Sequence, residues 1–430
     1  MGDMPLVNDD LIADLEARGL IHDSTDREHL RAQVAEGPIG IYYGCDPTAD
    51  SLHVGNLIGL VMLRRFQDAG HKAIALAGGA TGMIGDPSGK SEERNLLDDD
   101  TLNHNVACIK EQLGRIVDLD DPQRGVLVDN REWTQPISIL EFLRDVGRHV
   151  TVNQMLARES IKVRINSEHG ISFTEFSYML LQANDYLHLF DEYGCMIQIG
   201  GSDQWGNIIS GVDLIRRKRQ TAVHAFSWPL LTASDGSKIG KTAGARVWLD
   251  PAKTSPYTLR QHMMQTADAD VRAQLLTFSL RDVAEIEEIA AAHAEAPHKR
   301  LGQRTLATDV VSLVHSPEAA AAAEEAADLL FASDPTGASE QAFETLAAEI
   351  PHTRLHVDEL DDPINVFVAT DLAKSNGDAR RTMDQGAYYV NGVSFTANDQ
   401  LSDQKRLHGK YLLLRKGKKS HHLVELILPA

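Results

Sequence analysis

The first half of the chain alternates short β-rich runs with segments of helical periodicity, and this alternation most restricts the possible folds. The β-rich runs cover residues 39–45, 72–77, 126–129 and 195–199, and the helical segments between them cover 56–69, 101–117, 138–147 and 174–193. Strands that alternate with helices are typical of βαβ units, whose strands lie parallel. We therefore expect an α/β fold with a doubly wound, Rossmann-like parallel sheet over residues 1–225.

The second half has a different organisation. After a Gly-rich loop region at 226–252, five consecutive helical patterns predict a helical domain over residues 253–331. The stretch 332–362 is polar and interrupted by proline, so we expect a linker there. From residue 363 to 430, two short helical patterns, a turn at 375–378 and three β-rich runs predict a small α+β domain.

Charge restricts what the chain binds. A formal net charge of −20 repels polyanions on average, so any binding of nucleic acid must depend on a local basic surface. One candidate is the run at 405–419, which contains Lys405, Arg406, Lys410, Arg415, Lys416, Lys418 and Lys419. A charge run is more often a solvated face than a binding site. The residues alone leave both interpretations open.

Neither a membrane nor an oxidising compartment is indicated. The first residues mix acids with single apolar side chains, unlike a signal peptide, and no apolar run is long enough to span a bilayer. The three cysteines, Cys45, Cys108 and Cys195, are widely spaced and include no CxxC pair. This pattern argues against a disulfide framework and a structural zinc site, so we expect a cytoplasmic protein without a metal centre.

Residues 42–56 run from a buried strand through an Asp-Pro turn into a helix that begins near His53. The start of a helix presents unpaired N–H groups and the positive end of the helix dipole, which together bind anions such as phosphate. His53 and Asn56 lie three residues apart on one face and can donate hydrogen bonds, while Gly55 lets a base approach the backbone. A histidine at this position is more often a capping or surface residue.

A second candidate is the segment 235–244, which carries Lys238 and Lys241 in a Gly-rich context. Lysine ammonium groups on long stems suit a departing pyrophosphate, although paired lysines in such loops are usually only exposed to solvent. The Walker A phosphate loop requires glycine where Asp235 stands, and residues 85–91 have a spacing one residue too short. A P-loop NTPase is therefore disfavoured.

A third candidate is a polar stripe on the helix predicted over 174–193. Tyr178, Gln182 and Asp185 stand at i, i+4 and i+7, on one face of an otherwise apolar helix. Buried polar groups need partners because leaving them unpaired is costly. A structural network and a polar ligand explain the stripe equally well.

Together these features resemble class I aminoacyl-tRNA synthetases. The segments TADSLHVGN, GGATGMIGDPSGK, TEFSYMLLQANDYLHL and QIGGSDQWGN narrow the resemblance to the bacterial tyrosyl branch, over nearly the whole chain. Two departures are plain: Asn56 replaces the second histidine of the family signature, and KIGKT replaces KMSKS. Both replacements keep hydrogen-bonding or charged groups, so we expect them to change the reaction rates more than the presence of the activity.

The resemblance implies a tyrosine–tRNA ligase that activates L-tyrosine with Mg-ATP and transfers it to the 3′ end of tRNA(Tyr). It implies that Asp185 and Tyr42 contact the phenolic hydroxyl, with the other tyrosine contacts made by Asp86, Asn130, Tyr178, Gln182 and Gln204. His53, Asn56, Lys238 and Lys241 are expected to be catalytic and, with Asp46, Gly55 and Asp203, to contact ATP. No tightly bound cofactor is expected, and the family's homodimer carries over as an expectation.

The carboxyl end resembles the RNA-binding module named for ribosomal protein S-four, through residues 372–381 and 385–392. This context favours RNA binding by the basic run, so the predicted phosphate contacts are Arg380, Arg381, Lys405, Lys410, Lys416, Lys418 and Lys419. Three alternatives stay open: a tryptophanyl-type synthetase, a nucleotidyltransferase that does not use tRNA, and an RNA-binding protein derived from a synthetase.

Overall fold

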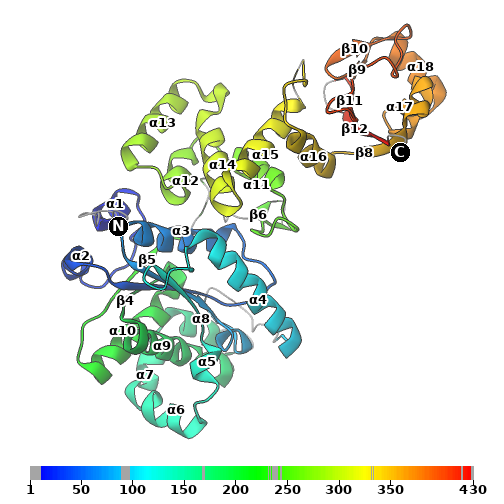
Figure 1. Ribbon diagram of the computed structural model, residues 1–430. Helices are drawn as coiled ribbons and strands as arrows, with labels where there is room; N and C mark the ends of the chain where they lie inside the picture. Colours follow the sequence, from blue (N-terminus) through cyan, green and yellow to red (C-terminus); the bar gives the residue numbers. More distant parts are fainter. Residues whose placement is uncertain are drawn as a thin grey trace. The chain divides into compact units, whose positions relative to one another are not determined.

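The computed structural model describes residues 11–88, 97–166, 170–230, 232, 234, 241–242, 245–330, 332, 334–417 and 420–427. The chain forms two compact units. The first contains Met1–Thr254 and Gln265–Asp309, and the second contains Ser255–Met264 and Val310–Ala430. Both are drawn in Figure 1, and each is described by itself below.

The first unit is built on a five-stranded parallel sheet with the strand order β3-β2-β1-β4-β5. The strands are β1 (Gly40–Cys45), β2 (Lys72–Ala77), β3 (Gly125–Asp129), β4 (Cys195–Gly201) and β5 (His224–Trp228). Their side chains are mostly buried, as is usual for a parallel sheet covered on both faces. The predicted doubly wound sheet is confirmed, and β5 is a strand that the sequence pattern did not indicate.

Helices cover both faces of this sheet. On one face lie α3 (Val54–Asp68) and α4 (Asp99–Ile116), and on the other α9 (Phe173–Tyr193) and α10 (Trp205–Arg219) pack against each other (Figure 1). The strand order reverses between β1 and β4, the position at which doubly wound sheets bind ligands beyond the carboxyl ends of their strands. We therefore expect a ligand site at the segments that follow β1 and β4.

The ends of α9 follow from local chemistry. Ser172 caps its first turn by accepting the Glu175 N–H, and Gly194 ends it at φ +65°, a conformation that glycine adopts without a steric cost. The remaining elements of this unit are α1 (Leu11–Ala17), α2 (Arg27–Glu36), α5 (Arg131–Thr134), α6 (Ile139–Asp145), α7 (Val152–Leu156), α8 (Glu159–Ile165), β6 (Lys241–Thr242), β7 (Ala245–Arg246), α12 (Val271–Phe278) and α13 (Val283–Glu295).

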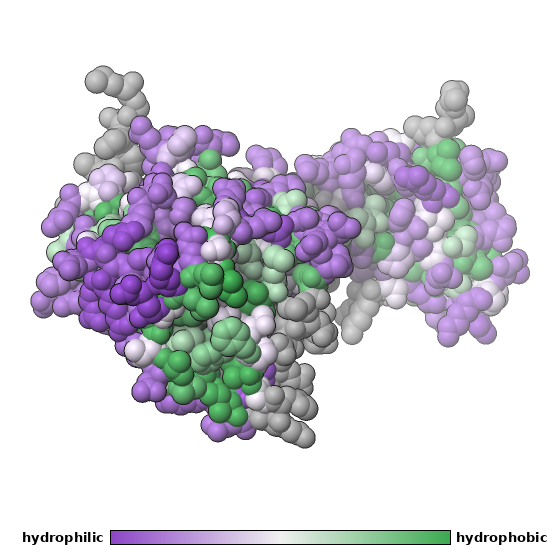
Figure 2. Space-filling view, turned by 90° about the horizontal axis from the view of Figure 1, so that it is seen from below, coloured by the Kyte–Doolittle hydropathy of each residue, from purple (hydrophilic) through white to green (hydrophobic). Residues whose placement is uncertain are grey.

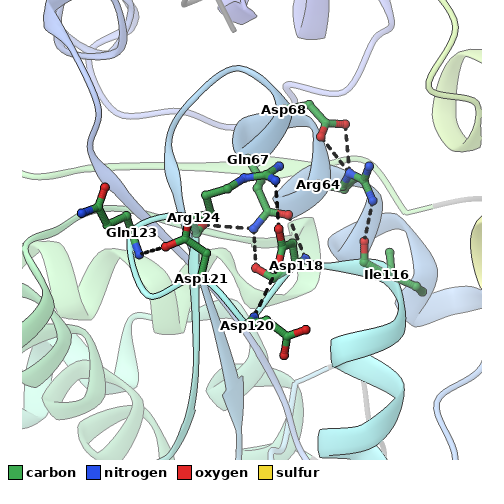
Figure 3. Close-up of polar contacts among 9 residues, drawn as sticks. All are labelled: Arg64, Gln67, Asp68, Ile116, Asp118, Asp120, Asp121, Gln123 and Arg124. Carbon is green, nitrogen blue, oxygen red and sulfur yellow. Dashed lines mark hydrogen bonds and ion pairs between the residues drawn. The ribbon is translucent and has the colours of Figure 1, made fainter. Parts of the chain in front are cut away.

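A buried glutamine fixes the loop that leads into β3. The Gln67 side-chain amide donates to the carbonyls of Asp118 and Arg124 at 2.6 and 3.0 Å, and its oxygen accepts the Asp118 N–H at 2.9 Å (Figure 3). Gly125 must lack a side chain, because a Cβ there would lie 2.3 Å from the Asp118 carbonyl oxygen. These contacts fix the start of β3 against α3, and Asn130, which follows the far end of β3, contacts Asp185 of the site described below.

The second unit contains a sheet with the strand order β10-β9-β11-β12-β8, antiparallel except for the β12–β8 pair. Its strands are β8 (His352–His356), β9 (Tyr388–Val390), β10 (Val393–Phe395), β11 (Tyr411–Lys416) and β12 (Ser420–Ile427). Its helices are α11 (Pro256–Met264), α15 (Pro317–Leu329), α16 (Glu340–Glu349), α17 (Pro363–Ala369) and α18 (Asn376–Asp384). Helix α14 (Leu301–Val314) contributes its residues from Val310 onward.

Alternating side chains of β11 build two cores, one on each face of this sheet. Leu412 and Leu414 belong to the cluster that contains Phe367 of α17, whereas Tyr411 and Leu413 pack with Phe343 of α16. Because successive side chains of a strand point to opposite faces, one strand can serve both cores.

Three expectations differ from the structure. The stretch 332–362 is not a linker, because it contains α16 and the edge strand β8. The stretch is mostly polar because α16 buries only one stripe, formed by Ala342, Phe343 and Leu346, and this polar composition is also typical of a linker. Residues 375–378 are the start of α18 and not a free turn, because the Ser375 hydroxyl accepts the Asp378 N–H as a helix cap. The residues predicted as one helical domain, 253–331, are divided between the two units.

None of the helices in the described part of the chain combines the length and the apolar composition that a membrane span requires. The three cysteines are free thiols, and Cys45 and Cys195 are buried in the first unit. Burial raises the pKa of the Cys45 thiol to about 12, so this group stays protonated at neutral pH.

Candidate active site

A cavity of about 560 Å³ opens at the carboxyl ends of the strands of the first unit, and this volume suits a small molecule. Eleven of the predicted site residues line it: Tyr42, Asp46, His53, Gly55, Asn56, Asp86, Tyr178, Gln182, Asp185, Asp203 and Gln204. They come from β1 and the segment after it, the start of α3, the segment after β2, α9 and the segment after β4. The fold thus brings together residues that are up to 162 positions apart in the sequence, at the place where doubly wound sheets bind ligands.

Three predicted residues do not line the described cavity. Asn130 is fully buried behind it and contacts Asp185 instead. Lys238 lies outside the described residues, and of Lys241 the structure describes the backbone, which pairs with Arg246 between β6 and β7.

His53 and Asn56 form the cap of helix α3. The Nδ1 atom of His53 accepts the Gly55 N–H at 3.0 Å, and the Asn56 side-chain oxygen accepts the His53 N–H at 3.1 Å. With Nδ1 as acceptor, a neutral imidazole carries its proton on Nε2, where it can donate to a ligand. Gly55 is required for this cap because a Cβ there would lie 2.8 Å from the imidazole. Capping and a role at the site are therefore compatible.

Asp185 forms the buried end of the cavity. It is 1% exposed, and its two oxygens accept hydrogen bonds from Asn130 Nδ2 at 2.9 Å and Trp133 Nε1 at 2.8 Å. Burial raises the pKa of this carboxyl group to about 7, although the two hydrogen bonds act in the opposite direction. Each oxygen can accept one more hydrogen bond, so the group can receive a hydroxyl donor from a ligand.

Tyr42 completes the polar end with Asp185. Its hydroxyl accepts a hydrogen bond from Gln198 Nε2 at 3.1 Å, and burial raises its pKa well above the usual value, so it stays a neutral phenol. Its proton therefore remains available to a ligand oxygen. A hydroxyl group between Tyr42 and Asp185 could accept from one and donate to the other.

The middle of the cavity is a network of carboxylates. Tyr178 donates to Asp46 at 2.8 Å, and Thr81 donates to the other Asp46 oxygen at 2.7 Å. Asp86 accepts from Gln204 Nε2 at 2.6 Å and from the Ser88 N–H at 3.0 Å. A cationic group of a ligand would find two carboxylates here, already oriented by their donors.

Sequence reasoning missed several residues of the site. Trp133, Gln198 and Thr81 orient Asp185, Tyr42 and Asp46, and Arg246 lines the cavity. Gln198 carried a readable signal, because it is the one polar side chain in the apolar strand sequence CMIQI. Trp133 and Thr81 carried none, since their partners are 52 and 35 residues away along the chain.

The predicted RNA-contacting residues of the second unit divide into two groups. Arg380 and Arg381 are exposed on α18, and Lys416 approaches them through Asp378, with 3.3 Å between its ammonium nitrogen and the carboxylate. Lys410 stands at the opposite end of β11 and forms an ion pair with Glu340 at 2.8 Å. Lys405 is exposed, and Lys418 and Lys419 lie outside the described residues. The strand direction therefore separates residues that form one run in the sequence.

Comparison with known proteins agrees with this geometry. The family model described as tRNA synthetases class I (W and Y) matches residues 34–332, and the model of the tyrosine–tRNA ligase SYY-like C-terminal domain matches residues 342–424. The curated tyrosine–tRNA ligase of Opitutus terrae is 47% identical over 97% of this chain and 100% of its own length. That of Mycobacterium tuberculosis is 47% identical over 97% of this chain and 99% of its own.

Solved structures give the same assignment. A C-terminally truncated mitochondrial tyrosyl-tRNA synthetase of Aspergillus nidulans matches with a TM-score of 0.68 and 32% identity, over 75% of this chain and 94% of its own. A tryptophanyl-tRNA synthetase of Plasmodium falciparum, 15% identical with a TM-score of 0.54 over 71% of this chain and 84% of its own, shares the fold alone. The chain therefore belongs to the class I tRNA synthetases and, within them, to the tyrosine–tRNA ligases.

Proposed function

We propose that the cavity of the first unit binds tyrosine at its buried end and Mg-ATP at the start of α3, and joins them as tyrosyl-adenylate. The observation that carries this proposal is the pairing of Asp185 and Tyr42 at one end with the capped helix start of His53 and Asn56 at the other. The distance between the two ends is bridged by the carboxylates of Asp46 and Asp86.

In the first reaction step, the tyrosine carboxylate attacks the α-phosphorus of ATP. A new oxygen–phosphorus bond forms, and the bond from the α-phosphorus to the bridging oxygen breaks with its electron pair, which leaves on pyrophosphate. No side chain forms a covalent intermediate, so the protein contributes position and electrostatic stabilisation. His53 and Asn56 donate hydrogen bonds to the phosphoryl oxygens, and Lys238 and Lys241 neutralise the pyrophosphate.

The amino acid is recognised by polar groups at both of its ends. Asp86, Tyr178 and Gln182 hold the α-ammonium group, while Asp185 and Tyr42 pair with the phenol. Gln204 completes the pocket through its hydrogen bond to Asp86. Asn130 supports this pocket from behind, by fixing Asp185. Phenylalanine would leave Asp185 and Tyr42 without their hydroxyl partner, and an unpaired buried polar group costs about 1–3 kcal/mol. Asp46, Gly55 and Asp203 contact the adenosine part of ATP.

Tyrosine affinity should depend on pH through Asp185. Tyrosine donates its phenolic proton best to the ionised carboxylate, so affinity should fall about tenfold per pH unit below the pKa of about 7. Isothermal titration at pH 6, 7 and 8 measures this, with ATP affinity as the internal control. Equal tyrosine affinity at pH 6 and 8 would contradict the assignment.

The effect of the same group on the ligand-free protein has the opposite sign. Its pKa is raised from 3.8 in the unfolded chain to about 7 in the fold, so the folded state binds more protons between these values. The contribution of Asp185 to the free energy of unfolding is therefore largest at low pH and is lost as the pH rises through 7.

Transfer of tyrosine to tRNA requires a basic surface for the polyanion, and we assign it to α18 and the end of β11. Arg380, Arg381 and Lys416 contact RNA phosphates there, which position the tRNA without reading its bases. Arg415, whose guanidinium carbon lies 4.1 Å from the centroid of the Tyr389 ring, stands on the opposite face of β11 and is not part of this surface. Lys405, Lys418 and Lys419 remain further predicted contacts.

Replacement of Arg380 and Arg381 by alanine should lower kcat/KM for tRNA charging by about 10- to 30-fold at ~0.1 M salt, because two phosphate contacts are lost. Tyrosine-dependent pyrophosphate exchange should stay unchanged. The matched control, Arg354→Ala with Lys410→Ala, removes the same charge, and we expect a smaller effect because Arg354 is paired with Glu425 and Lys410 with Glu340. Equal losses in the two double variants would argue for a general charge effect and against a defined site.

The active protein is, we infer, a homodimer that uses an apolar face of the first unit. Of the fourteen large apolar residues exposed in the described part of the chain, eight fall between residues 139 and 173. They are Ile139, Leu140, Leu143, Val152, Leu156, Val163, Ile165 and Phe173, from α6, α7, α8 and the start of α9. Figure 2 shows this apolar area facing the viewer. A contiguous apolar surface of this kind is typical of an interface between subunits.

A buried ion pair holds this face in place. The Arg164 guanidinium of α8 lies 2.6 Å from the Glu175 carboxylate of α9, and both side chains are 2% exposed. Glu175 stands one turn before Tyr178, so the same helix carries part of the apolar face and part of the tyrosine site. A second copy that covers this face would therefore also restrain α9.

The test of the proposed function is ATP–pyrophosphate exchange, measured with each amino acid in turn. Exchange should depend on tyrosine and Mg-ATP and should be negligible with tryptophan. Tryptophan has no hydroxyl to occupy the site between Tyr42 and Asp185. Exchange that depends on tryptophan and not on tyrosine would therefore favour the tryptophanyl alternative. Activity without tRNA charging would favour a nucleotidyltransferase. The free thiols fit a reducing compartment, and the cytoplasm is the location that we propose.

A further inference from the structure

The cavity contains more negative than positive charge. Its described lining includes four carboxylates, Asp46, Asp86, Asp185 and Asp203, and Arg246 is the only lysine or arginine among these described lining residues. A nucleoside triphosphate is itself a polyanion, so its binding needs cations to offset this field. Arg246 lines the cavity together with His53, Gly55 and Asn56, the residues at the start of α3.

Arg246 rests on a tryptophan that is fixed to that helix start. Its guanidinium carbon lies 5.6 Å from the centroid of the Trp248 ring, a distance typical of a cation–π contact. Trp248 forms an isolated antiparallel bridge with His53, and the two rings are 6.3 Å apart.

The flanking backbone makes this attachment firm. The Val54 N–H donates to the Val247 carbonyl at 3.0 Å, and the Leu249 N–H donates to the Leu52 carbonyl at 2.8 Å. Backbone hydrogen bonds on both sides of Trp248 therefore join the segment after β7 to the segment that leads into α3. This arrangement holds Arg246 beside the anion-binding end of the helix before any ligand arrives.

A second cation on the same ring provides a comparison. The ammonium group of Lys253 lies 5.7 Å from the Trp248 ring centroid, but it forms an ion pair with Asp50 at 2.9 Å. Arg246 forms no ion pair with a carboxylate in the described part of the chain. One of the two cations is thus neutralised by the protein, and the charge of the other is available to a ligand.

We propose that Arg246 contacts the β- and γ-phosphates of ATP and the departing pyrophosphate. The planar guanidinium group can bind two phosphate oxygens at once and keeps its charge throughout the reaction. When the bond to the α-phosphorus breaks, the electron pair moves onto pyrophosphate, and Arg246 stabilises the charge that builds there. This inference rests on the proposed function, because it names a further contact at the same site.

Arg246→Met tests the charge, since methionine keeps an unbranched stem over the Trp248 ring and loses the cation. We expect kcat/KM for ATP, and for pyrophosphate in the reverse reaction, to fall by about 10- to 100-fold, the effect of losing a charged hydrogen bond. KM for tyrosine should be unchanged. Arg246→Lys should lie between the wild type and Arg246→Met, because lysine keeps the positive charge but loses the contact to two phosphate oxygens at once.

The matched control is Lys253→Met, which removes the other cation from the same ring and should change these constants by less than about twofold. Wild-type constants in Arg246→Met would overturn the proposal. So would equal losses in the two methionine variants, because they would assign the effect to the Trp248 platform and not to a phosphate contact.

Direct binding separates this proposal from the proposed function. Isothermal titration of the wild type and of Arg246→Met with Mg-pyrophosphate requires neither tyrosine nor catalysis. Weaker binding by the variant would support the phosphate contact even if the wild type showed no tyrosine-dependent exchange, a result that would overturn only the proposed function. Equal binding by the two proteins, with equal midpoints of thermal unfolding, would overturn the role of Arg246.

Discussion

Asp185→Asn should lower kcat/KM for tyrosine activation by about 100-fold or more, because a buried charged hydrogen bond and its geometry are lost together. The carboxylate accepts from Asn130 and Trp133, and both of these groups are donors. An asparagine would turn one acceptor into a third donor, so one of the two contacts would be left unpaired in a buried position. The phenol of tyrosine would lose its acceptor at the same time.

Tyrosine-dependent pyrophosphate exchange measures this effect, and the ratio of kcat/KM for tyrosine to that for phenylalanine should fall as well. The matched control is Asp129→Asn, since Asp129 is close enough to Asp185 in the fold to act on its charge and is largely buried, but it pairs with Lys110 at 3.0 Å and does not line the cavity. This control should keep most of the activity. Wild-type activation by Asp185→Asn would remove Asp185 from the recognition of the hydroxyl.

Replacing Ile139 and Leu140 by aspartate should convert the dimer to a monomer, with at least about a 1000-fold rise in Kd, because each apolar side chain contributes roughly 1.5–3 kcal/mol when buried. Both residues lie on α6, and their side chains are 73% and 77% exposed in the single chain. A symmetric interface loses each contact twice, and four buried carboxylates would add a desolvation cost.

Sedimentation velocity from nanomolar to micromolar protein measures the dissociation. Val393→Asp with Ile427→Asp is the matched control, because both residues are exposed apolar side chains of the second unit, outside the proposed interface. The control should sediment as the wild type. A wild type that is monomeric at micromolar concentration would contradict the homodimer. If the Ile139→Asp, Leu140→Asp variant dimerises as tightly as the wild type, the dimer interface lies elsewhere.

The second unit was the part least readable in the sequence. Residues 332–362 seemed to be a linker because α16 buries a single narrow stripe and β8 is an edge strand with mostly exposed side chains. Such elements are stable only against the sheet that they cover, and the strand β12 that pairs with β8 lies about 70 residues further along the chain. Local pattern cannot report a partner at that distance.

Three features could be predicted from the sequence alone: the doubly wound sheet, the polar stripe of Tyr178, Gln182 and Asp185, and the helix start at His53. Each of these is a local pattern: alternation, helical spacing, or a cap formed within three residues. The groups that complete the site became visible only in the folded chain. Gln198 reaches Tyr42 because the two are register partners in neighbouring strands, Trp133 reaches Asp185 because the segment after β3 lies beside α9, and Trp248 reaches His53 through an antiparallel bridge. Each contact joins residues that no sequence spacing relates.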